Sequence, residues 1–190
     1  MNTQLILASA SPRRRELLAL TGVPFTVESA DVDESCALPM KEAVVEISRR
    51  KAAAIAKAHP GCTVLASDTL VFVDDTPLGK PRDEADAFRM LSSLRNRWHQ
   101  VCTGVVVCDS SGLMHTGTDV TDVHFTHMTD EEIRRYIATG EPMDKAGAYA
   151  LQGAAGLWID QIRGSSSCVI GLPLDLTRRL LEESGIEILP

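Results

Sequence analysis

The stretch Leu5-Ile6-Leu7-Ala8-Ser9-Ala10-Ser11-Pro12-Arg13-Arg14-Arg15-Glu16-Leu17-Leu18 decides the fold of this chain. An apolar run leads through two serines into residues whose apolar positions follow helical spacing. Ser11 is a good N-cap, and Pro12 suits the first position of a helix. The stretch therefore predicts a buried strand over Gln4–Ala8 and, directly after it, a helix over Pro12–Thr21.

Three consecutive arginines, Arg13 to Arg15, stand in the first turn of the predicted helix. A helix N-terminus has free N–H groups and a partial positive charge, so it favours acidic residues and attracts anions. A bound polyphosphate would compensate the arginines; the alternative is a solvated basic patch. Arg14 precedes Leu17 and Leu18 by three and four residues, so it starts on the buried side of the helix.

Length and charge limit the class of protein. The chain has 190 residues, which fits one domain or one domain with two lobes, and we expect a single domain over residues 1–190. The net charge of -7 argues against a general nucleic-acid-binding protein, since such proteins need a basic surface. This charge does not exclude one small anion in a local basic cleft.

The cysteines and the hydropathy indicate a cytoplasmic protein. Five cysteines, an odd number without a Cys-x-x-Cys pair, support neither a disulfide framework nor a zinc site. No apolar run approaches the ~20 residues that a membrane span needs. The N-terminus becomes polar by Ser9 and basic by Arg13, unlike a signal peptide. We therefore expect reduced thiols, and neither membrane nor nucleic acid as a partner.

The remaining chain alternates between strand and helix patterns. Strands are expected over Phe25–Glu28, Thr63–Ser67, Leu70–Val73, Val101–Cys108, Val120–Thr126 and Gly156–Ile162, and helices over Lys41–His59, Asp83–Leu94, Thr129–Thr139 and Pro173–Ser184. Ser165-Ser166-Ser167 is expected to be a loop. This order predicts an α/β fold with a mixed central sheet flanked by helices and two lobes around a cleft.

Two residues have positions that suggest a role. Lys51 falls on the apolar stripe of its helix, between Ile47 and Ile55, so it either snorkels past the edge or points into a cleft. Asp68 directly follows an apolar strand, a placement typical of site residues in α/β proteins. A turn-forming aspartate is the alternative.

Together the candidate residues suit attack of water on phosphorus. Glu34 and Asp68 could hold a hard divalent cation, Mg²⁺ or Mn²⁺, unless Glu34 is only a solvated loop acid. The residues that could hold phosphate oxygens are Arg13, Arg14, Lys51 and Lys80. A metal, a clamp for charged oxygens and a carboxylate near the water are what phosphoryl chemistry requires.

Other motifs are absent or weak. His124 and His127 would face opposite sides of a strand, so we expect surface histidines rather than a metal pair. No dinucleotide fingerprint, Walker-type loop or Gly-x-Ser-x-Gly elbow occurs. Ser9 is therefore interpreted as a hydrogen-bond donor to phosphate and not as a nucleophile.

At this point the chain resembles the Maf family of nucleoside triphosphate pyrophosphatases. The resemblance covers nearly the whole chain. The motifs that carry it are Leu7-Ala8-Ser9-Ala10-Ser11-Pro12-Arg13-Arg14, Ser67-Asp68-Thr69, Gly79-Lys80-Pro81-Arg82, Asp144-Lys145-Ala146-Gly147-Ala148-Tyr149 and Gly171-Leu172-Pro173-Leu174. It implies a two-lobed α/β fold similar to the inosine triphosphatase type, a homodimer, and metal-dependent cleavage between the α- and β-phosphates of a nucleotide.

The resemblance also implies roles for individual residues. Asp68 would be the catalytic proton acceptor, and Glu34 would help Asp68 to hold the metal. The residues that would grip the triphosphate are Ser9, Arg14, Lys51 and Lys80. Three positions mark the subfamily: Arg13, Thr69 and Gln152 resemble the dTTP/UTP pyrophosphatases, whereas the 7-methyl-GTP relatives resemble one another in tryptophan, glutamine and glutamate.

The sequence thus predicts a dTTP/UTP pyrophosphatase that releases the monophosphate and pyrophosphate, with modified pyrimidine nucleotides as further candidate substrates. One alternative is a pyrophosphatase for 7-methyl-GTP or another modified nucleotide. Another is a nucleotide-binding regulator of cell division and septum formation that hydrolyses little. Asp68 discriminates between the classes, because a pure binder gains nothing from a carboxylate beside a polyphosphate.

Overall fold

A computed structural model describes residues 4–189 of the chain. Its sheet has seven strands, in the order β2-β1-β3-β5-β6-β7, with β4 paired to β3. The strands are β1 (Leu5–Leu7), β2 (Phe25–Val27), β3 (Thr63–Val73), β4 (Thr76–Leu78), β5 (Arg97–Cys108), β6 (Met114–Phe125) and β7 (Ile159–Arg163). Since β1 is parallel to β2 and β3 while β7 is antiparallel to β6, the predicted mixed sheet is confirmed.

Helices flank this sheet, as the sequence predicted. The α-helices are α1 (Pro12–Ala19), α2 (Met40–Ala58), α3 (Glu84–Leu94), α4 (Asp130–Ala138), α5 (Ser166–Ile170) and α6 (Leu174–Glu183). Three short 3₁₀ helices are η1 (Glu141–Asp144), η2 (Ala146–Ala148) and η3 (Ala154–Trp158). In the part of the chain that the structure describes, no helix has the length and apolar character needed to cross a membrane.

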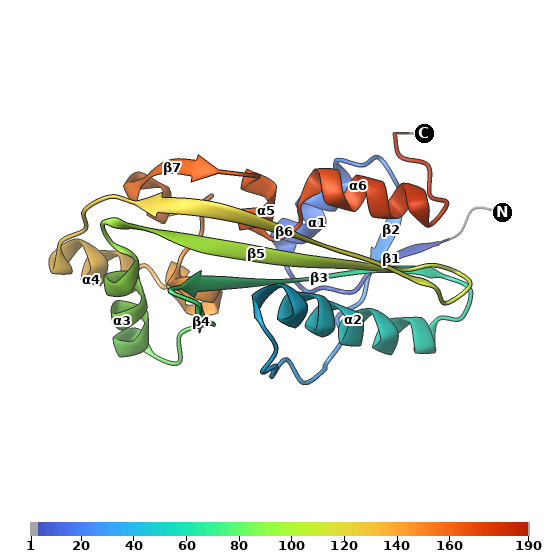
Figure 1. Ribbon diagram of the computed structural model, residues 1–190, viewed down its shortest axis with the longest axis horizontal. Helices are drawn as coiled ribbons and strands as arrows, with labels where there is room; N and C mark the ends of the chain where they lie inside the picture. The colour runs from blue at the N-terminus through green and yellow to red at the C-terminus, as the bar shows by residue number, and fades with distance from the viewer. Residues whose placement is uncertain (1–3, 190) are drawn as a thin grey trace. The chain divides into compact units, whose positions relative to one another are not determined.

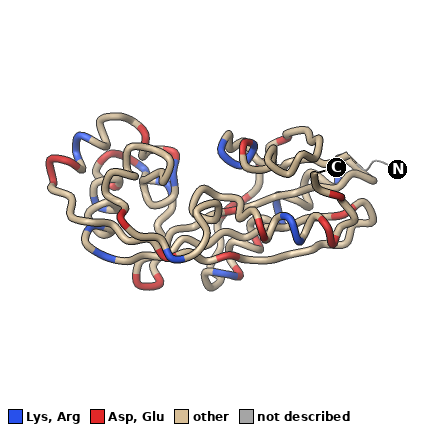
Figure 2. Tube along the Cα trace, turned by 90° about the horizontal axis from the view of Figure 1, so that it is seen from above, with Lys and Arg blue, Asp and Glu red and all other residues tan. Residues whose placement is uncertain are grey.

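The chain folds into two compact units. Unit 1 consists of the described parts of Met1–Asp68, Thr103–Asp119 and Gly171–Pro190, and unit 2 consists of Thr69–Cys102 and Val120–Ile170. Strands β3, β5 and β6 each contribute residues to both units. Acidic and basic segments are interspersed in both units (Figure 2). The single domain over residues 1–190 stays a prediction, and its residues 1–3 and 190 lie outside the described residues.

In unit 1, α2 covers one face of the sheet, and α1 and α6 lie on the other (Figure 1). Ala52 and Ile55 of α2 pack in one buried cluster with strand residues such as Val106. At Gly104 of β5, an added Cβ would lie 2.6 Å from the backbone carbonyl oxygen of Val44. The backbone of α2 therefore approaches β5 as closely as only glycine permits.

In unit 2, α3 and α4 bury an apolar core that includes Leu91, Phe125 and Ile133. Both helices begin as their sequences predict. The Asp83 side chain accepts a hydrogen bond from the Asp86 amide at 2.7 Å. Thr129 and Glu132 form a reciprocal capping box at the start of α4. These caps fix the residue at which each helix begins.

Several local predictions were wrong, including the starts of β5 and β6, which lie at residues 97 and 114 instead of 101 and 120. Asp68 does not follow a strand, because β3 runs unbroken through it. No strand was predicted over residues 76–78, but Asp74 and Asp75 adopt positive φ, and β4 pairs back on β3. The three serines start α5 instead of forming a loop, with the Ser165 hydroxyl accepting from the Cys168 amide. Residues 156–158 belong to η3, so β7 begins only at residue 159.

Candidate functional site

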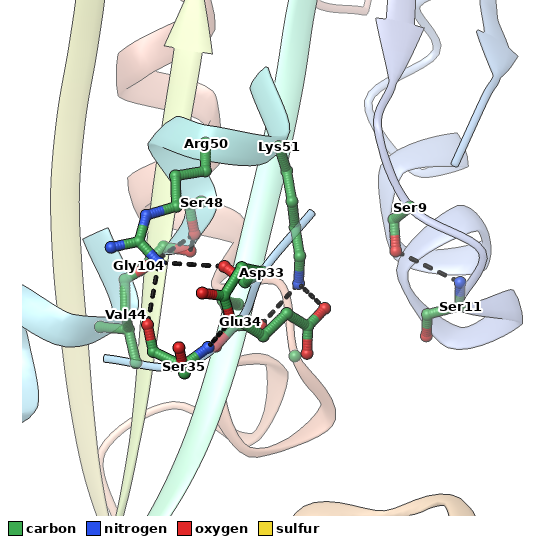
Figure 3. Close-up of polar contacts among 12 residues, drawn as sticks. Ser9, Ser11, Asp33, Glu34, Ser35, Val44, Ser48, Arg50, Lys51 and Gly104 are labelled. Carbon is green, nitrogen blue, oxygen red and sulfur yellow. Dashed lines mark hydrogen bonds and ion pairs between the residues drawn. The ribbon is translucent and has the colours of Figure 1, made fainter. Parts of the chain in front are cut away.

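A buried ion pair between α2 and β3 is the centre of the candidate site in unit 1. Lys51 Nζ lies 2.7 Å from Asp68 Oδ1, and both residues are only 7% exposed. Lys51 Nζ also lies 2.8 Å from Glu34 Oε1, on an exposed loop (Figure 3). Removing charges from water is costly unless they are paired, and both buried charges here have a partner. Of the two orientations predicted for Lys51, the structure has the inward one.

The junction of β1 and α1 presents a second set of polar groups. Ser11 caps α1, accepting from the Arg14 amide at 3.4 Å. The Ser9 hydroxyl accepts from the Ser11 amide at 3.2 Å and from Arg14 Nη1 at 3.4 Å. Arg14 Nε donates to the carbonyl oxygen of Gly171 at 2.9 Å. The guanidinium is thus oriented by contacts from two segments of unit 1.

The carbonyl of Gly171 is a site component for which sequence reasoning predicted no role. It accepts from Arg14 and also from the Ser67 hydroxyl, at 2.6 Å. One backbone oxygen therefore joins the start of α1 to the residue before Asp68. Its only signal in the sequence was the motif Gly171-Leu172-Pro173-Leu174, which cannot show a carbonyl contact.

The electrostatics of Arg14 connect these two sets of groups. Burial lowers the pKa of Arg14, and the charges of Asp68 and Glu34 oppose this shift, whereas Arg13 adds to it. An arginine has so high an intrinsic pKa that it stays charged at neutral pH. Unit 1 therefore combines cations of α1 and α2 with the carboxylates of Asp68 and Glu34.

Glu34 and Asp68 are the residues of this set that could hold a divalent cation. Oxygens of Glu34 and Asp68 both contact the Lys51 ammonium nitrogen, so these two carboxylates lie near one another and could share a cation. Mg²⁺ is commonly held by one or two carboxylates together with water and phosphate oxygens. Within residues 4–189 no group of three or more His, Cys, Asp and Glu could hold a metal alone. Phosphate and water would have to complete the ligand set.

The other predicted site residues belong to unit 2. Thr69 is half-buried and follows Asp68 on β3. Lys80 is exposed, directly after Gly79, whose carbonyl oxygen accepts from the Gly147 amide at 3.0 Å. Thus Ser9, Arg13, Arg14, Glu34, Lys51 and Asp68 lie in unit 1, and Thr69, Lys80 and Gln152 lie in unit 2.

Gln152 is exposed in the turn between η2 and η3, and neighbouring contacts fix this turn. Glu141 Oε2 accepts from the Ala154 amide at 3.1 Å, and Glu141 Oε1 accepts from the Tyr136 hydroxyl at 2.7 Å. An added Cβ on Gly153 would lie 2.1 Å from the Glu141 carboxylate. The Gln152 side chain therefore extends from a turn in which Gly153 and Ala154, the next two residues, are fixed by the Glu141 carboxylate.

His124 and His127 have separate partners in the structure. His124 is half-buried, and its Nδ1 lies 2.6 Å from Asp160 Oδ1. His127 is exposed beyond the end of β6, with Asn96 as its hydrogen-bond partner. Of the two, only His127 is exposed as the sequence predicted for a surface histidine.

The fold is that of the Ham1 proteins. A Ham1 protein of Staphylococcus aureus superposes with a TM-score of 0.58 at 16% identity, covering 95% of this chain and 99% of that one. A HAM1 protein of Coxiella burnetii superposes with a TM-score of 0.55 at 14% identity and the same coverage.

Within this fold class the chain belongs to the Maf family, because the family model described as "Maf-like protein" matches residues 4–184. Relatives with the name dTTP/UTP pyrophosphatase include one from Desulforamulus reducens, 45% identical over 97% of this chain and 98% of its own. Another, from Myxococcus xanthus, is 47% identical over 98% of this chain and 95% of its own. The predicted family membership is confirmed.

Proposed function

We propose that this protein hydrolyses dTTP and UTP to the nucleoside monophosphate and pyrophosphate. The observation that supports it most is the buried Lys51–Asp68 pair, with Glu34 on the same ammonium and the arginine-rich start of α1 in the same unit. The relatives named dTTP/UTP pyrophosphatase are similar to this chain over nearly their whole length. Modified pyrimidine nucleotides are further candidate substrates.

In the proposed reaction, a water oxygen bonds to the α-phosphorus and the bond from this phosphorus to the bridging oxygen breaks. Asp68 accepts the proton of the water, because a carboxylate held by Lys51 has a fixed orientation. Arg14 and Lys51 stabilise the charge on the departing pyrophosphate, with Ser9 and Lys80 as further phosphate ligands.

Glu34 and Asp68 would hold the divalent cation, Mg²⁺ or Mn²⁺. When bound, it would neutralise phosphate charge and favour a deprotonated water. The two carboxylates that converge on Lys51 supply the oxygen ligands that such ions prefer.

Arg13, Thr69 and Gln152 would select the base. A primary amide is both donor and acceptor, so Gln152 can pair with the carbonyl and N3–H edge of a pyrimidine. Thr69 adds a small hydroxyl group. The half-buried Arg13 offers donors to carbonyl or ribose oxygens.

The decisive measurement is product chromatography of dTTP and UTP reactions with Mg²⁺ or Mn²⁺. Monophosphate plus pyrophosphate is expected. Diphosphate plus orthophosphate would mean attack at another phosphorus. Binding without turnover of any triphosphate would favour the nucleotide-binding regulator, and turnover of 7-methyl-GTP alone would favour the modified-nucleotide enzyme.

Base selection has its own test, the simultaneous change of Arg13→Trp, Thr69→Gln and Gln152→Glu. A methylated, cationic purine prefers an aromatic face and a negative charge, which the triple variant supplies. The ratio of kcat/KM for UTP over that for 7-methyl-GTP should fall, because unpaired hydrogen-bonding groups are rejected strongly. An unchanged ratio in a folded variant would place base selection elsewhere.

We further propose a cytoplasmic homodimer. All five cysteines lie within the described residues as thiols rather than disulfides, as suits a reducing compartment. The homodimer is proposed from the family resemblance, and light scattering after size-exclusion chromatography would give twice the chain mass of 20.6 kDa.

A further inference from the structure

Glu34 lies in a loop without regular secondary structure, between β2 and α2. Glu34 and its neighbours Asp33 and Ser35 are exposed. A side chain on such a loop must be ordered before it can act, and ordering costs conformational entropy. The contacts that fix this loop therefore decide where the Glu34 carboxylate lies.

The loop is bent by a local hydrogen bond around Glu34. The Ser35 amide donates to Asp33 Oδ1 at 2.8 Å, and the interaction with Ser35 lowers the pKa of Asp33. The two residues that bracket Glu34 are thus joined to each other.

Arg50 of α2 contacts the same two residues. Its Nη1 donates to the carbonyl oxygen of Asp33 at 3.0 Å and to that of Ser35 at 2.9 Å (Figure 3). Its Nε donates to Glu46 Oε1, one turn earlier on α2, at 3.0 Å. The guanidinium is therefore held by the helix while it binds the backbone on both sides of Glu34.

The next residue on α2, Lys51, contacts the Glu34 side chain itself at 2.8 Å. Two consecutive residues of α2 thus hold the loop. Arg50 binds the backbone of the loop, and Lys51 binds the carboxylate of Glu34. The planar fork of an arginine can serve several acceptors in fixed directions, which the single ammonium of a lysine cannot reproduce.

We propose that Arg50 is a positioning residue, which holds the loop so that the Glu34 carboxylate stays beside Lys51 and Asp68. Its consequence for catalysis rests on the proposed function, whereas its effect on the loop does not. Arg50 lies outside the motifs that carry the family resemblance.

Arg49 is a matched control on the same helix. It also binds Glu46, with Nε 3.0 Å from Oε2, but its side chain is 57% exposed and its contact is within α2. Like Arg50→Ala, Arg49→Ala therefore removes one positive charge and one ion pair with Glu46, but it removes no contact to the loop carbonyls.

Hydrogen–deuterium exchange measures the effect on the loop directly. In Arg50→Ala, peptides that contain the Ser35 amide, which donates to Asp33 Oδ1, should exchange this amide about tenfold faster than in the wild type, as a loss of two net hydrogen bonds allows. Arg49→Ala should leave this exchange unchanged. Unchanged exchange in Arg50→Ala would overturn the proposal, whether or not the protein cleaves UTP.

Mn²⁺ activation of UTP cleavage distinguishes a geometric role from a purely electrostatic one. The half-saturating Mn²⁺ concentration should rise about tenfold in Arg50→Ala, the scale seen when a residue that orients a metal ligand is lost. Removal of a positive charge alone would lower it. Arg50→Lys, which keeps the charge, should behave like Arg50→Ala; wild-type behaviour would overturn the role of the fork.

A double-mutant cycle with Glu34→Ala completes the test. If Arg50 acts through Glu34, then Arg50→Ala should change the Mn²⁺ dependence no further in the Glu34→Ala background. Additive effects would overturn the inference. A wild type that cleaves no triphosphate would contradict the proposed function alone, because the exchange measurement still reports on Arg50.

Discussion

Asp68 is the residue with the sharpest predicted effect. Its carboxylate is buried and hydrogen-bonded to Lys51, so Asp68→Asn keeps the size of the side chain but removes the charge and the base. We expect kcat for UTP to fall by at least ~10²-fold, the usual scale for loss of general base catalysis. Steady-state kinetics with saturating Mg²⁺ measures this.

Asp75→Asn is the control for Asp68→Asn. Asp75 is exposed in the turn before β4 with a φ of 60°, a conformation that asparagine also adopts readily. This variant should retain wild-type kcat. A folded Asp68→Asn protein that kept more than about a tenth of wild-type kcat would contradict the role of Asp68 as base.

The site was only partly predictable at this scale. Acidic and basic side chains such as Glu34, Lys51 and Asp68 stand out in the sequence, and the structure brings these three together. The carbonyl of Gly171 and the hold of Arg50 on the loop could not be predicted. A backbone oxygen has no side-chain signature, and Arg14 and Gly171 are 157 residues apart.

Among the elements, α2 is the one on which most of unit 1 depends, since it supplies Lys51 and packs closely on β5. Gly104→Ala would place a Cβ 2.6 Å from the Val44 backbone, where no flexible side chain can yield. The helix must shift, and we expect a loss of about 1–3 kcal/mol in the free energy of unfolding. Urea denaturation measures this loss. The activity should be reduced as well.

Gly79→Ala provides the comparison, because an added Cβ there meets nothing within 4 Å. Its free energy of unfolding should change by less than about 0.5 kcal/mol, as for most surface substitutions. Equal stabilities of the two variants would mean that α2 accommodates the methyl group without cost.

Elements with strong periodicity or clear caps were predictable, and the others were not. The Asp83 and Thr129 caps define α3 and α4 from local sequence alone. In contrast, β3 continues through the polar Asp68 because it pairs with neighbours along the sheet. The short helix α5 and strand β4 were missed because few residues form them, so turn residues dominate their local pattern.

For the molecule as a whole, stability should fall in mild acid because of His99. This residue is 3% exposed, and Tyr149 OH lies 2.7 Å from its Nε2. Burial, with the charge of Arg97 as a smaller cause, lowers the pKa of His99 from 6.5 to about 3. The folded state therefore keeps His99 neutral while the unfolded state takes up a proton below pH 6.5.

The unfolding free energy should thus decrease as the pH falls from about 6.5 toward 3, with a slope approaching about 1.4 kcal/mol per pH unit. Trp98 and Trp158 both lie in unit 2 with His99, so tryptophan fluorescence in urea reports this unfolding. His99→Gln should remove the slope between pH 6 and pH 5, whereas His127→Gln should retain it. If His99→Gln kept the wild-type slope of unfolding free energy against pH, groups other than His99 would cause this slope.

The junction at Gly171 has a consequence for synthesis on the ribosome. The oxygen that orients Arg14 belongs to the segment of unit 1 that is translated after its other two segments, as do Leu172, Leu180 and Leu181, which are buried in unit 1. Before these residues are made, the ribosome has already synthesised the strands of the sheet that α6 will cover (Figure 1). A message that stops after Ile170 should therefore yield an inactive polypeptide with exposed apolar surface, which would depend on chaperones or be degraded.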